Sequence, residues 1–438
     1  KDVGLELRIP VFHASFDRYP NPSYEYLATE SFDKVNGSGP VIPTGSVGFS
    51  LPLPRGFGFG VGIFTPPGTP SLKFGNTAIN TINVDPNTET LPGTSGVRET
   101  PGRYLLIEKE VLAAFLMAGV GYSPIPQLRV GVSVGGGFVD VAFKNVSSVV
   151  GGALNDAEVL SDVKVLDAFV PRTTFSVAAT PIDSIDLLAT FTYTGDISAK
   201  GDLEVTGNGI TSGPVGDCAS PTPGPRCKVK DVTLKIPYQR FEVLLGGRYA
   251  QRRNKRERVL DPIKDEVWDV ELNAYWSQTS HVDNYTLHIR DANQQRQVSL
   301  ASDPAIATAP LPENARLFHG WKDTYGVRVG GDYNVLADFL ALRAGLGFET
   351  RGVPKANMNL DYWPVQRTTL SLGATVKLGR WKIHAAYAHV FNQTVDVKVG
   401  EGNVREVASI NGAASQVINE GKYSSRLDVF SLQGNVQF

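Results

Sequence analysis

Apolar and polar residues alternate with a period of two along most of this chain. In residues 370–378 every even position is apolar and every odd position is polar or glycine. Successive side chains of a β-strand point to opposite faces of the sheet, so such a run has one apolar and one polar face. The chain ends with the same pattern, whose apolar positions are Phe430, Leu432, Val436 and Phe438. The alternation predicts an all-β protein.

Fourteen runs of this kind occur in the 438 residues, and many of them have ten or more residues. A tilted strand that crosses a bilayer needs about 9–11 residues, whereas strands of soluble sheets usually have about five or six. The runs are therefore long enough to span a membrane. They lie near 2–12, 44–53, 56–65, 107–123, 127–143, 168–181, 184–198, 229–251, 266–290, 323–335, 338–350, 366–378, 381–399 and 423–438.

Long and short connections alternate between these runs. Tight links at 54–55, 336–337 and 379–380 contrast with long connections such as 13–43 and 66–106. Outer-membrane barrels combine an even number of antiparallel strands with short periplasmic turns and long extracellular loops. We therefore predict one domain over residues 1–438, a 14-stranded antiparallel transmembrane β-barrel with short periplasmic turns and long extracellular loops.

Soluble β-sandwiches and propellers also have many strands. The polar face here is rich in Gly, Ser, Thr and Asn, and charged residues make up only 20 % of the chain, below the ~25 % usual for soluble domains. No repeat of fixed period occurs, which argues against a propeller. The 42 Lys and Arg residues balance 44 Asp and Glu residues, so a nucleic-acid partner is not expected.

The two cysteines, Cys218 and Cys227, flank a stretch rich in proline and glycine. A close pair within a loop fits a disulfide in an oxidising compartment. Closing so small a ring would stabilise the protein by about 2–3 kcal/mol in the chain-entropy model. Two reduced thiols are the alternative. No further ligand has the spacing of a metal site, and we expect neither a metal nor a cofactor.

Catalytic motifs give little support for an enzyme. Residues 131–135 match G-x-S-x-G formally, but that motif requires a sharp turn from strand to helix. Here the match lies inside a continuing alternating run, and the six histidines of the chain are scattered. We therefore predict no enzymatic activity.

Several short motifs follow one another in the second half of the chain. They are His319-Gly320-Trp321-Lys322-Asp323-Thr324-Tyr325, Leu342-Arg343-Ala344-Gly345, Val353-Pro354, Pro364 with Arg367, and Leu372-Gly373-Ala374, with Lys235-Ile236-Pro237 and Tyr275-Trp276-Ser277-Gln278 upstream. In this order and spacing they resemble the FadL/TodX family of outer-membrane channels for long-chain fatty acids and hydrophobic compounds. The fourteen runs agree with the fold of that family.

The resemblance implies a location in the outer membrane of a Gram-negative bacterium. It also implies passive uptake of fatty acids or similar hydrophobic molecules, with membrane lipid around the barrel. The family has an N-terminal hatch before its first strand, whereas alternation begins here at Val3, so we expect no counterpart of the hatch. That difference leaves an alternative, a non-transporting membrane anchor or a subunit of a larger cell-envelope complex.

The run 56–65 has a face made only of glycine. Its members are Gly56, Gly58, Gly60 and Gly62, opposite an apolar face of Phe57, Phe59, Val61 and Ile63. Glycines in a strand permit a kink or a close approach. In the FadL family this strand bends and opens a lateral path into the bilayer, so the resemblance implies a wall opening near these glycines. A hydrophobic ligand gains about 0.8 kcal/mol per CH₂ by leaving into lipid. A thin closed wall is the alternative.

Charged residues recur on the polar faces of the later strands. They include Arg328, Asp332, Arg343, Glu349 and Arg367. Inside a barrel such charges should form ion pairs, because an isolated buried charge is costly. The alternative is that one of the three arginines binds the carboxylate of a ligand through its two-pronged guanidinium.

The connection 252–265 should be a short periplasmic turn but is strongly basic. Its basic residues are Arg252, Arg253, Lys255, Arg256 and Arg258. One interpretation is a solvated hairpin tip, and the other is a docking patch for an acidic periplasmic or envelope protein.

Six aromatic residues lie near the ends of predicted strands: Trp321, Tyr325, Tyr333, Trp363, Trp381 and Tyr387. Barrels carry girdles of aromatic side chains at the two membrane interfaces. We favour this position for the six residues, with the lining of a ligand cavity as the alternative.

Overall fold

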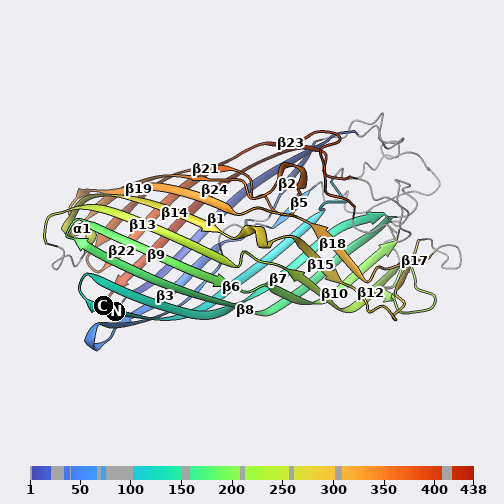
Figure 1. Ribbon diagram of the computed structural model, residues 1–438, viewed down its shortest axis with the longest axis horizontal. Coiled ribbons are helices and arrows are strands. Elements are labelled where there is room, and N and C mark those ends of the chain that lie inside the picture. Colours follow the sequence, from blue (N-terminus) through green and yellow to red (C-terminus); the bar gives the residue numbers. More distant parts are fainter. Residues whose placement is uncertain are drawn as a thin grey trace.

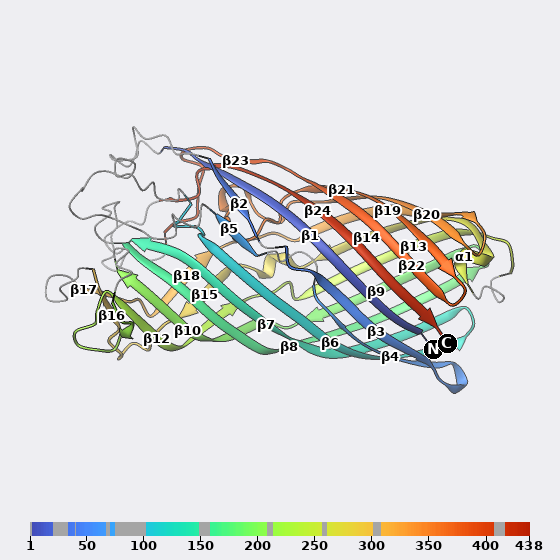
Figure 2. The same ribbon diagram turned by 180° about the vertical axis from the view of Figure 1, so that it is seen from behind.

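A computed structural model describes residues 2–20, 34–39, 41–66, 71–74, 102–148, 158–207, 213–255, 261–300, 308–406 and 417–438. The chain forms an elongated barrel of tilted strands (Figures 1 and 2). Both chain termini lie at one end, which we name the turn end, together with the short helix α1 (Pro262–Asp265). The long connections gather at the opposite end, which we name the loop end.

Fourteen antiparallel strands form the barrel, and pairing of the first with the last closes it. In chain order they are β1 (Asp2–Arg18), β3 (Thr44–Pro52), β4 (Phe57–Phe64), β6 (Glu108–Ile125), β7 (Leu128–Ser148), β8 (Glu158–Ile182), β9 (Ile185–Thr194), β13 (Phe241–Arg252), β14 (Glu266–Ser277), β19 (Thr324–Leu336), β20 (Leu340–Glu349), β21 (Arg367–Leu378), β22 (Trp381–Asn392) and β24 (Gly421–Gln437). The predicted fold class is confirmed.

A second group of strands extends the sheet at the loop end. β8 pairs there with β10 (Ile197–Gly207), which leads through β12 (Arg226–Ile236) and β15 (Asn284–His288) to β18 (Asn314–Phe318). We name these four strands the outer sheet. Shorter strands at the same end are β2 (Val35–Ser38), β5 (Leu72–Phe74), β11 (Gly216–Asp217), β16 (Gln297–Ser299), β17 (Thr308–Pro310) and β23 (Val395–Val397).

The outer sheet corrects two predicted runs. Residues 229–251 contain the end of β12 and nearly all of β13, and residues 266–290 contain both β14 and β15. Pro237 directly follows β12, and proline has no N–H with which to continue a ladder. The predicted loop 199–228 likewise contains most of β10. Each of these long segments therefore leaves the barrel wall at its loop end.

Large apolar side chains project outward from every barrel strand. Examples, each between 51 % and 63 % exposed, are Leu5, Leu116, Phe175, Leu245, Leu272, Leu346, Leu372 and Leu432. This belt is the surface that contacts acyl chains in a membrane barrel. The first outward charges beyond it toward the loop end are Glu110, Asp140 and Lys164, which mark its boundary on β6, β7 and β8.

Four of the six aromatic residues lie on barrel strands with the orientation that an aromatic girdle requires, and their place at the membrane interfaces stays a prediction. Tyr325, Tyr333, Trp381 and Tyr387 are exposed on the outer surface. The prediction is wrong for Trp321 and Trp363, which pack against a buried core at the loop end. Both lie in connections that fold back over the barrel, where the aromatic rings meet protein rather than the membrane interface. Within the described residues, no helix has the length and apolar character needed to cross a bilayer.

The buried core lies beyond the belt at the loop end. One cluster joins β6, β7 and β8 to the outer sheet, with Val141, Val163, Leu203 and Val232 among its members. A second cluster contains Phe16, Leu105, Met358, Leu360 and Tyr423, which are almost completely buried. It is built around residues 350–366, the connection from β20 to β21, which we name the plug loop. The loop end is therefore a packed cap over the barrel.

Candidate functional site

An apolar cavity of about 90 Å³ lies between the barrel wall and the outer sheet. Strands β6, β7 and β8 form one side, and the outer sheet forms the other. Its apolar lining consists of Val111, Val141, Phe143, Val163, Leu203, Leu234, Ile236, Leu287, Ile289, Ala315 and Leu317. The inward face of β6 and β7 changes from glycine and serine within the belt to valine and phenylalanine here. This change makes the cavity at the loop end apolar.

The plug loop contributes the polar end of the cavity. Asp361 is 1 % exposed, and its Oδ2 lies 2.7 Å from Nε2 of His319, which is 0 % exposed. The Nζ of Lys109 donates a hydrogen bond to the backbone carbonyl of Asp361 and lies 3.6 Å from the centroid of the Tyr362 ring. Three segments far apart in the sequence thus meet in one buried ionic cluster.

Burial and charge set the protonation states of this cluster, which lies beyond the membrane belt. Burial raises the pKa of Asp361, but His319 and Lys109 outweigh it and hold that pKa below its usual value. Burial lowers the pKa of Lys109 to about 8, against the opposing attraction of Asp361. Burial also raises the pKa values of Tyr285 and Tyr362, which keeps both phenols neutral. The cavity therefore carries one carboxylate and a lysine that loses its proton near pH 8.

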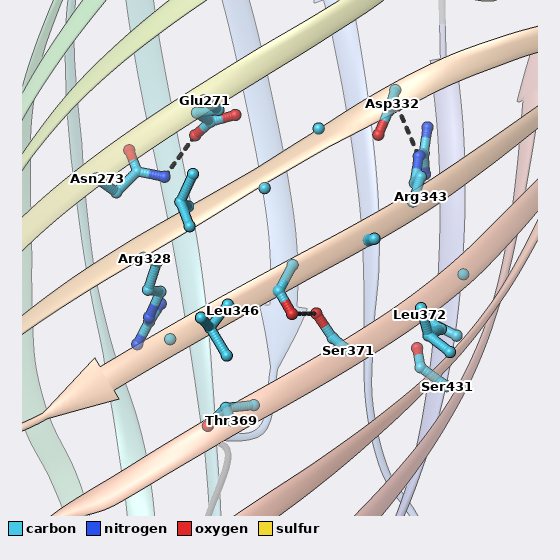
Figure 3. A pocket seen from close by; sticks show the side chains of 18 of the residues that line it. Glu271, Asn273, Arg328, Asp332, Arg343, Leu346, Thr369, Ser371, Leu372 and Ser431 are labelled. Atoms are coloured by element: carbon cyan, nitrogen blue, oxygen red, sulfur yellow. Dashed lines mark hydrogen bonds and ion pairs between the residues drawn. The ribbon is translucent and has the colours of Figure 1, made fainter.

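A second, more polar cavity of about 650 Å³ lies in the barrel lumen. Figure 3 shows side chains of β14, β19, β20 and β21 that line it. Of the three predicted arginines, Arg343 pairs with Asp332 at 2.8 Å and Arg367 pairs with Glu349 at 2.6 Å. Arg343 also lies 3.1 Å from Nδ1 of His384. The structure therefore brings all three arginines to one cavity, and for two of them it confirms an ion pair.

The glycine strand forms a closed wall. β4 is paired without a break to β3 on one side and to β6 on the other, from Phe57 to Phe64 along β6. Gly56 lies outside the strand in a turn, where its φ of +78° favours glycine. A Cβ on Gly58 or Gly60 would meet only backbone oxygens at 3.6–3.8 Å. Gly58 and Gly60 therefore keep the lumen wide and are not required by packing, whereas a Cβ on Gly62 would lie 3.0 Å from the backbone oxygen of Val47. A lateral opening here stays a prediction.

The basic connection is partly built into the barrel. Arg252 lies 2.6 Å from Asp186 and 3.0 Å from Glu266, and its side chain is 5 % exposed. This arginine cannot belong to an exposed docking patch. Arg253 donates to the backbone carbonyl of Glu266, while Lys255 is exposed. Arg256 and Arg258 lie outside the described residues.

The cysteine prediction is confirmed. Cys218 and Cys227 form a disulfide with a Cα–Cα distance of 5.0 Å. Both are fully buried in the core beneath the outer sheet, and Cys227 directly follows the first residue of β12. The bond therefore fastens the β11–β12 connection to that sheet. Among the described residues, no group of three or more His, Cys, Asp or Glu side chains could hold a metal ion.

Sequence reasoning missed the cluster of Lys109, His319 and Asp361. Lys109 and Asp361 are 252 positions apart, and neither belongs to a motif with a known spacing. His319 is the first residue of a motif that pointed to the family resemblance but not to a buried ionic cluster. The one available signal was a lysine on the inward side of β6, next to a valine that also faces inward.

Comparisons with known proteins agree with this architecture. Residues 265–438 match the family model described as outer membrane protein transport protein (OMPP1/FadL/TodX). The fold is similar to the crystal structure of a Pseudomonas aeruginosa FadL homologue, with 16 % identity, a TM-score of 0.67, and coverage of 100 % of this chain and 90 % of that one. No curated protein sequence matches.

Two further solved structures have the same fold. The P. putida toluene transporter TodX is 12 % identical, with a TM-score of 0.61 and coverage of 100 % of this chain and 90 % of that one. The CymD monoaromatic hydrocarbon channel is 11 % identical, with a TM-score of 0.55 and coverage of 100 % and 89 %. The resemblance inferred from the motifs is thus confirmed in sequence for residues 265–438 and in fold for the whole chain.

Proposed function

We propose that this outer-membrane barrel, which matches the OMPP1/FadL/TodX family over residues 265–438, is a channel for passive uptake of hydrophobic molecules into a Gram-negative bacterium. The apolar cavity at the loop end is the observation that carries the proposal. The apolar lining also holds the outer sheet to the barrel wall, but close packing of a core does not require an unfilled space. An apolar space of this kind can bind hydrophobic molecules, whose transfer out of water is favourable.

The cavity has the chemistry of a first binding site. An engineered apolar cavity of about 150 Å³ in another protein admits benzene, so a space of this order can take a single ring or part of a chain. Each methylene moved from water into it would contribute about 0.8 kcal/mol. Tyr285 and Tyr362 border the site, and the ring of Tyr285 lies 4.0 Å from that of His319. We propose fatty acids and similar hydrophobic compounds as the substrates.

Filling the cavity tests this function. Ala315 lines the cavity, and Ala315→Leu would place three more carbon atoms in it. We expect slower influx of a labelled hydrophobic probe into vesicles that carry the full-length protein. Ala274→Leu is the matched control, because Ala274 is exposed on a barrel strand and the added atoms enter lipid. Equal influx through both variants and the unchanged protein would refute the proposal.

We also propose that the substrate leaves sideways through the wall near β4. The support is the short reach of β3 and β4, which end at Thr44 and Phe64 while β1 and β6 continue. Beyond them, within the described residues, the sheet continues through β2 and β5, which share two residue pairs. Gly60 and Gly119 face each other across β4 and β6, so cysteines at both positions can form a disulfide that holds the strands together.

The stapled protein should show a reduced influx that a reducing agent restores. A second staple between β20 and β21, at the facing positions Gly345 and Ser371, serves as the control. If neither staple alters influx, the substrate does not leave through β4.

The turn end carries a further proposal, a contact with an acidic periplasmic or envelope protein. After the correction for Arg252 it rests on Arg253 and Lys255, with Arg256 and Arg258 outside the described residues. Charge reversal at Arg253 and Lys255 should abolish crosslinking to such a protein in intact cells. Unchanged crosslinking would leave a solvated turn as the correct interpretation.

A further inference from the structure

The three arginines of the luminal cavity differ in one respect. Arg343 and Arg367 each have a carboxylate partner at 2.8 Å or less. Among the residues that the structure describes, no carboxylate lies within ion-pairing distance of Arg328, whose guanidinium instead lies 4.7 Å from the centroid of the Tyr275 ring. Figure 3 shows Arg328 apart from the Asp332–Arg343 pair. Among the described residues, Arg328 is therefore the arginine of this cavity that has no carboxylate partner.

Glycines build the surroundings of this arginine. Gly326 has no side chain where the ring of Tyr275 lies, since a Cβ there would overlap the ring. Gly347 lies directly opposite Arg328 on one side and Thr369 on the other. A Cβ on Gly347 would lie 3.4 Å from Cγ of Arg328 and 3.7 Å from Cβ of Thr369. The glycine thus leaves a gap between a guanidinium and a hydroxyl group.

The nearby acidic residues are already engaged. Glu349 pairs with Arg367, and Asp332 pairs with Arg343. Glu271 accepts a hydrogen bond of 2.6 Å from the amide of Asn273, the residue directly opposite Arg328 on β14. Glu271 keeps its negative charge, because its partner is a neutral amide. Among the described residues, the guanidinium of Arg328 has no carboxylate partner, so it can bind one monoanionic group. The planar fork of arginine matches a carboxylate in particular.

We propose that Arg328, Gly347 and Thr369 form a second binding site, which takes the carboxylate of an organic acid passing through the lumen. Two N–H groups of Arg328 donate to the carboxylate oxygens, and the Thr369 hydroxyl donates a further hydrogen bond. Tyr275 and Val390 offer apolar contact to the rest of the molecule, since Val390 lies opposite Thr369 on β22. This site rests on the proposed function, because it assumes that substrates reach the lumen, and it gives the channel a preference for acids over neutral compounds.

Calorimetric titration of the full-length protein in detergent tests the site, with benzoate and its neutral analogue benzyl alcohol as probes. Arg328→Gln should weaken benzoate binding about tenfold to a hundredfold, the range expected when hydrogen bonds to a charged group are lost. Benzyl alcohol binding should change less than about twofold. Arg328→Lys keeps the charge without the fork and should recover part of the affinity.

The matched control removes a paired arginine. The double variant Asp332→Asn with Arg343→Gln eliminates one ion pair of the same cavity without changing the net charge, and it should bind benzoate like the unchanged protein. Benzoate binding that survives Arg328→Gln, or that falls equally in the control, would overturn the proposal.

Influx measurements separate this proposal from the proposed function. Arg328→Gln should lower the influx of dodecanoate relative to dodecanol, while dodecanol influx persists. If neither compound crosses, the transport function fails, yet benzoate titration still decides whether Arg328 binds an acid. A loss of dodecanoate selectivity together with unchanged benzoate binding would refute the luminal site for both aromatic and aliphatic acids.

Discussion

Replacing Asp361 with asparagine tests whether the buried ionic cluster holds the plug loop in place. The carboxylate of Asp361 faces His319 at 2.7 Å, and both side chains are at most 1 % exposed. Its pKa stays below the usual value despite burial, because His319 and Lys109 favour the charged form. Asparagine keeps the shape and can still accept the hydrogen bond that Oδ1 receives from the backbone N–H of Tyr362. The substitution therefore removes mainly the charge.

Breaking a buried ion pair by removing one partner costs about 3–5 kcal/mol. A local opening free energy lowered by that amount increases the open population of the plug loop at least about a hundredfold. Hydrogen exchange reports the opening at the amides of Gly352 and Val353, which donate to the carbonyl of Pro364. Their exchange should accelerate by that factor in Asp361→Asn.

An exposed ion pair of the same connection provides the control. Lys355 and Glu401 lie 2.5 Å apart with side chains 38 % and 45 % exposed, and exposed pairs contribute little to stability. Glu401→Gln should leave the exchange of Gly352 and Val353 unchanged. If Asp361→Asn exchanges no faster than this control, the buried cluster does not anchor the loop.

Three further predictions concern the cap and the wall. The folded state releases the proton of Lys109 near pH 8, whereas an unfolded chain keeps it up to a pH of about 10.4. The cap should therefore gain stability as the pH rises between these two values. Lys109→Met should remove this pH dependence, as measured by hydrogen exchange. Gly60→Ala should leave thermal unfolding unchanged, whereas Gly326→Ala should lower the unfolding temperature because its Cβ overlaps a tyrosine ring. Replacing Cys218 and Cys227 with serine should destabilise the outer sheet by about 2–3 kcal/mol in protease-resistance measurements while the barrel stays folded.

The barrel could be predicted because its physical constraint is repeated in every strand. Lipid on one side and a lumen on the other impose a period of two, and that period identified all fourteen barrel strands. The outer sheet could not be distinguished from the barrel strands in the sequence. Its strands β12 and β15 have the same alternation, and each lies next to a barrel strand in the chain: β12 before β13, and β15 after β14. Pro237 was the one local signal of a break after β12.

The candidate site was predictable only where neighbouring strands supply it. Arg343 and Asp332 face each other across a tight β19–β20 turn, so their polar faces could be aligned from the sequence. Asp361 contacts Lys109 because the plug loop folds back into the cap, and the path of a loop cannot be predicted from sequence periodicity. Arg367 has an acidic partner, whereas Arg328 has none among the described residues. This difference depends on side-chain directions, which the alternation of apolar and polar residues does not determine.

Anomalous diffraction from crystals of the full-length protein soaked with a brominated alkane would show whether the apolar cavity at the loop end binds hydrophobic molecules. We expect bromine density in the cap, between Val163 of β8 and Leu287 of β15, in the cavity that the two strands line. Bromine found only against the outer belt, with that cavity unoccupied, would contradict it.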